Sequence, residues 1–527
     1  MLSFRLLPGS KQSFHGCLGM FSLLGGLICS MMACSSTGFS AEPVPSLLAG
    51  TAKVDITDYD AGPVNDPLYV KVVALRSGKA TTVLISVDAV AIGEIGRIPN
   101  DYLPAVRGRL EQELGISPGH VLVNASHCHG VVLPDIVGKT LEAVKAAVEH
   151  LVPVRVGAGT GEETRIMENR RLRMKDGKEI DVRHAYSLPP DEAVDSVGPT
   201  DPEIGILKLV REDGGVLAVI YNFACHPIQG VPGGANTADI IGYASRVIEE
   251  NLGDGAMALF LQGCAGDINP AYYKDVHHPR SAEPLGNLLG LSTLRGVRNI
   301  ECRADSRLAI HQEFLTLPRG DRTAAIAHLE AEQRRLLKQL RGTSLNFKTF
   351  LPLMVKYEHS PEFPSYYSHR YLYDDAQKRP DLLALDAENR KNMAAYLQNI
   401  NTMENLTRLQ TNLTLLKKHQ ASMVASGKRT IDVELLGVRI GDFVLITFPG
   451  ELTTPIGQNI KKNSPFDLTF VAGYTNGYIY YAPTAGQLHN VGGAQEDSDC
   501  ILAPEWQALF ESKAAAMLQQ LSPKAIR

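Results

Sequence analysis

The sequence has no excess of basic residues. Its 527 residues include 52 Lys and Arg against 57 Asp and Glu, which gives a formal net charge of −5. A protein that binds nucleic acid needs a basic surface, so this composition argues against nucleic acid as a partner. No stretch after residue 45 is long and apolar enough to span a membrane. The sequence also lacks internal repeats and low-complexity tracts, and nothing in it indicates an obligate protein partner.

Cysteines are too few and too irregularly spaced to form a disulfide framework. Of eight in the whole chain, three lie before residue 35, and the other five are Cys128, Cys225, Cys264, Cys302 and Cys500. Five is an odd number, and their spacing matches no known pattern of bridges. A free cysteine behaves as a small apolar residue. We therefore expect Cys128, Cys225 and Cys264 to be reduced packing residues.

The N-terminus has the pattern of an export signal. Arg5 and Lys11 precede the apolar run Gly19–Ala33, and small residues follow up to Ala41. The sequence Met-Met-Ala-Cys, which ends at Cys34, resembles a lipoprotein cleavage box. Residues 1–41 are therefore predicted to be an export signal, with a lipoprotein signal ending at residue 33 as the alternative. Either form places the protein in the periplasm or outside the cell, and the alternative anchors it to lipid through Cys34.

The rest of the chain reads as an α/β protein with mixed β-sheets flanked by helices. Residues 46–320 alternate strand patterns such as Tyr69–Arg76 with helical patterns such as Lys139–His150. The alternation returns over residues 430–521, so these two segments are predicted to form one domain.

Residues 321–429 interrupt this alternation and predict a helical insertion. Two amphipathic helical patterns flank an aromatic segment, which we expect to be a loop; its members are Tyr357, Phe363, Tyr366, Tyr367, Tyr371 and Tyr373. Such a loop could serve as a lid or as a rim in peripheral contact with a membrane. Ordinary packing of the helices onto the sheets is the alternative.

Four apolar, strand-like segments each run into a residue that can bind a metal. Gly119–Val123 leads to His127 and His129, and Gly215–Phe223 leads to His226. Phe443–Phe448 leads to Glu451, and Leu468–Tyr474 leads to Tyr481. Two imidazoles, a carboxylate and a phenol form a donor set suited to a single catalytic Zn²⁺ with an open position for water. In an extended segment His127 and His129 would point the same way. The alternatives are satisfied polar histidines, and a Glu451 that lies at a helix N-terminus.

Five short motifs resemble those of the neutral/alkaline (non-lysosomal) ceramidase family. They are Ser126–Gly130, Asn222–His226, Cys264–Pro270, Pro449–Thr454 and Asn476–Thr484. Their order and rough spacing agree with the family over roughly residues 47–505. The resemblance implies the ceramidase-like catalytic fold and a Zn²⁺ held by His127, His226, Glu451 and Tyr481. It also implies that His129 either supports these side chains or acts as an acid and base on the substrate.

The pair Asn169-Arg170 resembles the pair with which this family binds substrate. Two departures from the family are visible. Asn269 stands where the family has a serine to which the nucleophile role is often given, and the family's Tyr-Glu pair is not found near residues 492–496. Arg170 could stabilise a developing oxyanion, and the Asn269 amide could donate a hydrogen bond to it.

The resemblance implies an exported zinc-dependent amidohydrolase. The expected substrate is the amide of an N-acyl sphingoid base or a related lipid, cleaved by zinc-activated water. Two alternatives remain open. One is a zinc hydrolase of another amide or ester, such as an acyl amino sugar or a peptide-like compound. The other is a non-catalytic binding protein on a degenerate hydrolase scaffold.

Overall fold

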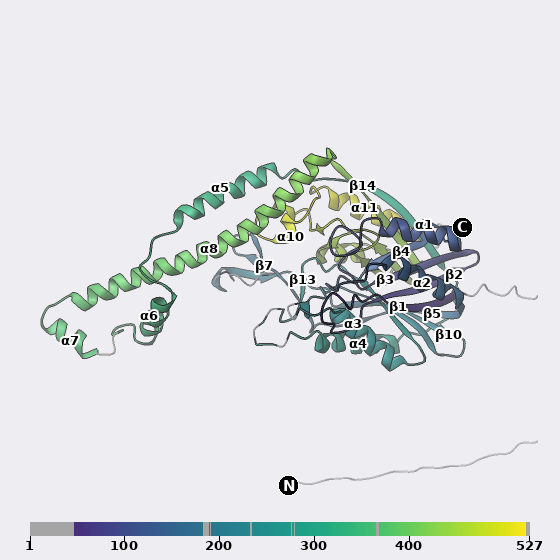
Figure 1. Cartoon of the computed structure of the whole chain (residues 1–527), viewed down its shortest axis with the longest axis horizontal. Helices are drawn as coiled ribbons and strands as arrows, with labels where there is room; N and C mark the ends of the chain where they lie inside the picture. Colours follow the sequence, from purple (N-terminus) through teal and green to yellow (C-terminus); the bar gives the residue numbers. More distant parts are fainter. Residues whose placement is uncertain are drawn as a thin grey trace, which may run out of the picture. The chain divides into compact units, whose positions relative to one another are not determined.

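The computed structural model describes residues 47–522 apart from 183–188, 190, 232–233, 274, 276, 279 and 365–367 (Figure 1). The predicted export signal, Tyr366 and Tyr367 therefore lie outside the described residues. The chain divides into two units, Met1–Val44 and Pro45–Arg527. Every described helix and strand belongs to the second unit.

The largest element is an eight-stranded mixed sheet. Its strands are β1 (Leu47–Asp55), β2 (Tyr69–Ser77), β3 (Ala80–Val87), β4 (Val121–Ala125), β5 (Val152–Glu162), β10 (Glu203–Arg211), β11 (Val216–Phe223) and β12 (Met257–Gln262). Their order is β12-β11-β10-β5-β1-β2-β3-β4. Neighbours are antiparallel except for β3/β4 and β11/β12. These strands are rich in β-branched residues, which suit a pleated and buried surface.

A smaller sheet packs against one face of the large one. It consists of β14 (Leu308–Pro318), β15 (Thr430–Ile440), β16 (Phe443–Thr447) and β18 (Thr469–Ala472), in that order. Residues such as Leu445 and Phe470 meet Leu207 and Leu259 in a shared apolar cluster. β15 and β16 form an antiparallel hairpin. Ile440 pairs with Phe443 across a two-residue turn in which Gly441 has a positive φ of 59°.

Helices cover both outer faces of the paired sheets. The large sheet is covered by α1 (Tyr102–Leu114), α2 (Ile136–Glu149), α3 (Asp239–Leu252) and α4 (Glu283–Arg298). The small sheet is covered by α9 (Thr454–Lys462) and α11 (Trp506–Gln520). The layers therefore run helix, sheet, sheet, helix. This arrangement confirms the predicted fold class.

Short elements fill the space around one end of the sheets. They are β6 (Met167–Asn169), β7 (Arg171–Met174), β8 (Glu179–Asp181), β9 (Val194–Val197), β13 (Ile268–Pro270), β17 (Glu451–Leu452), β19 (Tyr481–Ala482) and α10 (Gln495–Ser498). Most of the candidate site residues lie in or beside these elements.

Four helices lie between β14 and β15, which are adjacent antiparallel strands. They are α5 (Thr323–Gln339), α6 (Phe347–His359), α7 (Ser368–Ala376) and α8 (Asp381–Ser426). Figure 1 shows α5 and α8 side by side, and their leucines form a common cluster. We refer to α5–α8 as the insertion. None of the described helices combines the length and the hydropathy required to span a membrane.

The expectation of an aromatic loop in the insertion holds for Phe363, which lies outside the helices, but is wrong for Tyr357, Tyr371 and Tyr373. Tyr357 belongs to α6 and Tyr371 to α7, and both are buried. The side chain of Asn346 accepts a hydrogen bond from the backbone N–H of Thr349 and so caps α6. The hydroxyl of Tyr357 donates to Asp386 of α8 at 2.6 Å. Capping and this tertiary contact favour a helix where composition alone suggested a loop.

All five cysteines of the described residues are free, and four of them are buried. Burial raises the pKa of the Cys128 thiol well above its usual range and that of Cys500 to about 11. Since the thiolate is the reactive form, these four should resist alkylation in the folded protein, and the half-buried Cys302 should react first. Peptide mapping after alkylation of the native and unfolded protein checks this order. A disulfide mapped between any two of the five would contradict it.

Candidate metal centre

A single glutamine brings together the loops that follow two distant strands. These loops follow β4 and β11. Gln262 ends β12, and its backbone N–H donates to the side-chain oxygen of Asn124 in β4 at 2.9 Å. The side-chain amide of Gln262 donates to the carbonyl oxygens of Ser126 and Cys225, at 3.3 and 2.9 Å. The residues that follow these two carbonyls are His127 and His226, and their ring centroids lie 4.9 Å apart.

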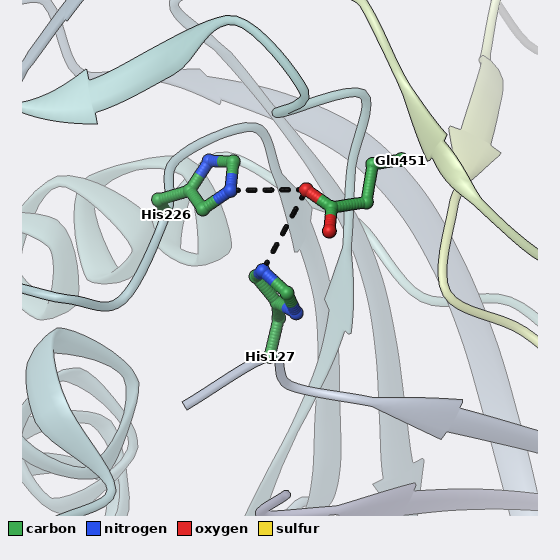
Figure 2. Close-up of side chains that lie close together, drawn as sticks. All are labelled: His127, His226 and Glu451. Carbon is green, nitrogen blue, oxygen red and sulfur yellow. Dashed lines mark hydrogen bonds and ion pairs between the residues drawn. The ribbon is translucent and has the colours of Figure 1, made fainter. Parts of the chain in front are cut away.

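Glu451 completes a buried cluster with these two histidines. Figure 2 shows both imidazoles directed at its carboxylate, whose Oε2 lies 3.1 Å from Nε2 of His226 and 3.7 Å from Nε2 of His127. One ligand atom from each of the three residues falls within 4.8 Å of the others. The Glu451 carboxylate is buried and lies against both imidazoles. The alternative of a helix N-terminal acid is wrong, because Glu451 lies in β17.

The orientation of both imidazoles suits metal binding. Nδ1 of His127 lies 2.6 Å from the carbonyl oxygen of Val90, and Nδ1 of His226 lies 2.9 Å from that of Ile268. A carbonyl oxygen only accepts, so each Nδ1 carries the proton and each Nε2 directs a lone pair at the cluster. This is the usual support of a metal-bound histidine. The two histidines and Glu451 therefore fit a bound metal ion.

The electrostatics keep the cluster in its metal-binding protonation state. Burial lowers the pKa of His127 to about 4, against the opposing effect of Glu451. Burial alone would raise the pKa of Glu451, but the adjacent imidazoles of His127 and His226 and the hydrogen bond from Tyr478 hold it well below its usual range. At neutral pH the group therefore combines neutral imidazole with carboxylate, which is the form that binds a metal.

His127 and His129 are not in a continuous extended segment as expected. His127 has a positive φ of 68°, held by a hydrogen bond from its backbone N–H to the carbonyl oxygen of Ala89 at 3.0 Å. This strained backbone turns its imidazole into the cluster. His129 is exposed, and its ring centroid lies 5.6 Å from that of His127. Both side chains line the same cavity.

Two tyrosines that the sequence analysis did not single out hold the Glu451 carboxylate. The hydroxyl of Tyr474 donates to Oε2 at 3.1 Å, and that of Tyr478 donates to Oε1. Burial and the Glu451 charge raise the pKa of both phenols well above their usual range, so they remain donors. Tyr478 lies inside the tyrosine motif of Asn476–Thr484, which could have indicated it. No pattern distinguishes Tyr474.

Tyr481 lies next to the cluster but contacts a different group. In the parallel pairing of β17 and β19 it stands opposite Glu451. Its hydroxyl lies 3.4 Å from Nη2 of Arg170, and its side chain lines the same cavity as the histidines. Tyr481 thus faces the same cavity as the two histidines and contacts Arg170.

Arg170 is buried beside the cluster and fixed by three groups. Its Nε donates to Glu496 at 2.6 Å, its Nη1 donates to the side-chain oxygen of Asn269 at 3.0 Å, and its Nη2 donates to the carbonyl oxygen of Gly266. Glu496 is fully buried and lies in α10. Glu496 was not predicted as a site residue, because no local pattern marks a carboxylate in a four-residue helix. Asn269 lies in β13, opposite Glu168 of β6, and contacts the site through its hydrogen bond with Arg170.

Asn169 is not one of the described residues that line the cavity, and its side chain bonds to neighbouring loops instead. Its side-chain nitrogen donates to the carbonyl oxygen of Pro199 at 2.8 Å and to the carboxylate of Asp267 at 3.0 Å. Asp267 in turn accepts hydrogen bonds from the backbone and hydroxyl of Thr454, at 2.8 and 2.9 Å. Neither Asn169 nor Asn269 is among the described residues that line the cavity.

The cavity in front of the cluster has a volume of about 270 Å³. Its polar walls come from the cluster, His129, Arg170 and four tyrosines, and apolar side chains cover part of the remainder. The described lining residues are Val90, Ile95, His127, His129, Arg170, His226, Ile228, Val231, Tyr273, Lys418, Glu451, Tyr478, Tyr480, Tyr481 and Asp499. Apolar walls with a few directed polar groups are typical of a small-molecule site.

No family model matches the sequence, and no curated protein matches it significantly. Solved structures do match the fold. One is neutral ceramidase from Pseudomonas aeruginosa, at a TM-score of 0.57 and 14% sequence identity, covering 91% of this chain and 75% of that chain. Another is a ceramidase complexed with C2, with the same TM-score, identity and coverage. The chain therefore has a neutral ceramidase-like fold, as its short motifs predicted.

Proposed function

We propose that the chain is an exported, zinc-dependent amidohydrolase that acts on the amide of an N-acyl sphingoid base or a related lipid. One observation carries the proposal. The Nε2 atoms of His127 and His226 and the buried carboxylate of Glu451 converge within 4.8 Å at the wall of a cavity. The ceramidase-like fold and the neighbour complexed with C2 support a lipid amide as the substrate.

His127, His226 and Glu451 would hold the ion, with Tyr481 as a fourth ligand from the same cavity. A Zn²⁺ ion bound there would lower the pKa of water to about 7 and polarise the scissile carbonyl. Tyr474 and Tyr478 hold the Glu451 carboxylate in the orientation in which it faces both imidazoles. The buried ligands and their hydrogen-bonded partners are therefore pre-organised.

The chain's own residues have distinct roles around the substrate. Arg170 lines the cavity, where its guanidinium would bind the carbonyl oxygen as negative charge develops. His129 is exposed at the same cavity and would pass a proton to the leaving amine. The apolar side chains of Val90, Ile95 and Ile228 would contact the acyl chain and exclude water.

Asn269→Ala tests whether water or a side chain is the nucleophile. Asparagine has no hydroxyl with which to form an acyl-enzyme, and here its side-chain oxygen accepts a hydrogen bond from Arg170. We expect the variant to fold, to keep its metal and to lose about 1.5–3 kcal/mol of transition-state stabilisation, the value of a hydrogen bond to a charged group. Steady-state kinetics and metal analysis check this. An acyl adduct trapped on any side chain of the wild type would overturn the water mechanism.

A screen of amide substrates tests the proposed function. N-acyl sphingoid bases should be cleaved more efficiently than an acyl amino sugar or a blocked peptide of equal acyl length. The control is Arg170→Met, which should lower turnover of the best substrate by about 100-fold or more if the guanidinium stabilises the oxyanion. If only the amino sugar is cleaved, the same site hydrolyses a different class of amide. Retained metal without cleavage of any substrate would favour a binding protein.

Export and contact with membranes are further parts of the proposal. Export rests on the basic residues and apolar run of residues 1–41. Cell fractionation with N-terminal sequencing tests it, and a cytoplasmic protein that begins at Met1 would refute it. Peripheral membrane contact rests on large apolar side chains of the insertion that are exposed, such as Phe347, Val355 and Leu372. Sedimentation with neutral lipid vesicles tests it, and a protein that stays in the supernatant would contradict it.

A further inference from the structure

The C-terminal part of α8 forms one wall of the metal-site cavity. Lys418 lines the cavity, and the next residue, His419, bonds to another lining residue, with its Nε2 2.7 Å from the Asp499 carboxylate. The ring of His419 also lies edge-on to Tyr480, at a centroid distance of 4.7 Å. The insertion thus takes part directly in the site.

This wall is firmly attached to the rest of the unit. Arg408 of α8 donates to the backbone and side-chain oxygens of Asp181 at 2.6 and 3.0 Å. Asn412 donates to the carbonyl oxygen of Gly492 at 3.3 Å. Leu409 and Leu413 pack against α5. These contacts fix the helical turn that carries Lys418, so the position of its backbone is set by the fold.

The ammonium group of Lys418 is held over an aromatic ring at the cavity rim. Its Nζ lies 4.7 Å from the ring centroid of Tyr480, within the range of a cation–π interaction. The Tyr480 ring lies 5.4 Å from that of Tyr478, whose hydroxyl donates to Glu451. Two tyrosine rings therefore separate the lysine cation from the metal cluster along the wall.

Lys418 is the cavity cation whose charge is not matched by a carboxylate. Arg170 is paired with Glu496, whereas across the described part of the chain no carboxylate lies within ion-pair distance of Lys418. The adjacent Lys417 points elsewhere and pairs with Glu330 of α5 at 2.7 Å. The carboxylates that line the cavity are engaged, Asp499 with His419 and Glu451 with the two imidazoles.

We propose that Lys418 is a specificity-determining residue for an amide substrate that carries an oxyanion, such as a carboxylate or a phosphate. The inference rests on the proposed amidohydrolase function and names its substrate class. With the scissile amide at the Glu451 cluster, the anionic group lies against Lys418 and Tyr480. The acyl chain lies along the apolar side of the cavity.

The test compares three amides with one acyl chain: neutral N-dodecanoyl ethanolamine, its phosphomonoester, and N-dodecanoyl-β-alanine. The wild type should favour at least one anionic amide in kcat/KM by about ten- to hundredfold, the range for a hydrogen bond to a charged group. Lys418→Met should abolish this ratio, and Lys418→Glu should invert it. Lys417→Met is the matched control and should leave the ratio unchanged. The phosphomonoester and carboxylate arms show which oxyanion is preferred.

Binding of the same three compounds, measured by calorimetry, separates this inference from the proposed function. If the wild type cleaves none of them, the hydrolase proposal fails. The ratio of its affinities for the anionic and neutral amides, and the loss of that ratio in Lys418→Met, still test whether Lys418 selects an oxyanion. If the neutral amide is cleaved and bound as well as the anionic ones, the inference is overturned and the hydrolase proposal stands. An equal effect of Lys417→Met and Lys418→Met would also overturn it, because the effect would then be one of surface charge.

Discussion

Glu451→Gln and His226→Ala are each expected to lose most of the bound metal. Glutamine cannot supply a carboxylate charge, and alanine removes one of two imidazole donors, while the neighbours of each position remain in place. Loss of a residue that merely supports a metal ligand costs about 10–100-fold in affinity, so loss of a ligand should exceed about 100-fold. Metal analysis of the purified variants, together with titration of the apoproteins with Zn²⁺, measures the change.

His129→Gln is the control for this prediction. His129 lies in the same cavity but is exposed and outside the buried group of three. The His129→Gln variant should keep its metal but lose activity, because the proposed proton transfer by His129 is removed. Full metal content in both Glu451→Gln and His226→Ala would show that the ligands are wrongly assigned.

Glu496→Gln is expected to destabilise the fold strongly. Glu496 is fully buried, its Oε1 lies 2.6 Å from Arg170 and its Oε2 lies 3.5 Å from Arg171. Removing one charge of a buried network leaves the others uncompensated, which typically costs about 3–5 kcal/mol. Denaturant unfolding followed by circular dichroism measures the free energy of unfolding.

Two controls make the prediction for Glu496 specific. Glu179→Gln removes another partner of Arg171, which lies 2.7 Å away. The Glu179 side chain is 19% exposed, so this variant should lose less stability than Glu496→Gln. The double variant Arg170→Met with Glu496→Leu should cost less than the sum of its single variants, because it leaves no unpaired charge at that contact. A Glu496→Gln protein with wild-type stability would contradict the role given to this network.

The three residues of the metal cluster were predictable because their signal is local. Each follows an apolar run that is long enough to indicate a buried strand, and a polar residue at such an end stands out. The prediction needed only that the strand ends meet. Gln262 joins the two loops that carry the histidines, and Glu451 meets both imidazoles directly. The layered α/β fold was predictable for the same reason, since alternating apolar patterns mark strands and helices within a few residues of their observed ends.

The residues missed by sequence reasoning act through contacts between distant parts of the chain. Glu496 meets Arg170 across 326 positions, and Lys418 reaches the cavity from an insertion whose pattern indicates only helices. Tyr474 looks like any strand tyrosine until Glu451 is placed beside it. Charge networks and cavity walls depend on tertiary packing, which no local pattern encodes.

Zinc content and amide hydrolysis measured on the same preparation test the central claim most directly. The protein should contain about one Zn²⁺ per chain, as single-metal catalytic sites do. It should hydrolyse an N-acyl sphingoid amide, lose that activity on chelation and regain it when Zn²⁺ is restored. Undiminished hydrolysis by metal-free protein, or a zinc-loaded protein that cleaves no amide, would contradict the account.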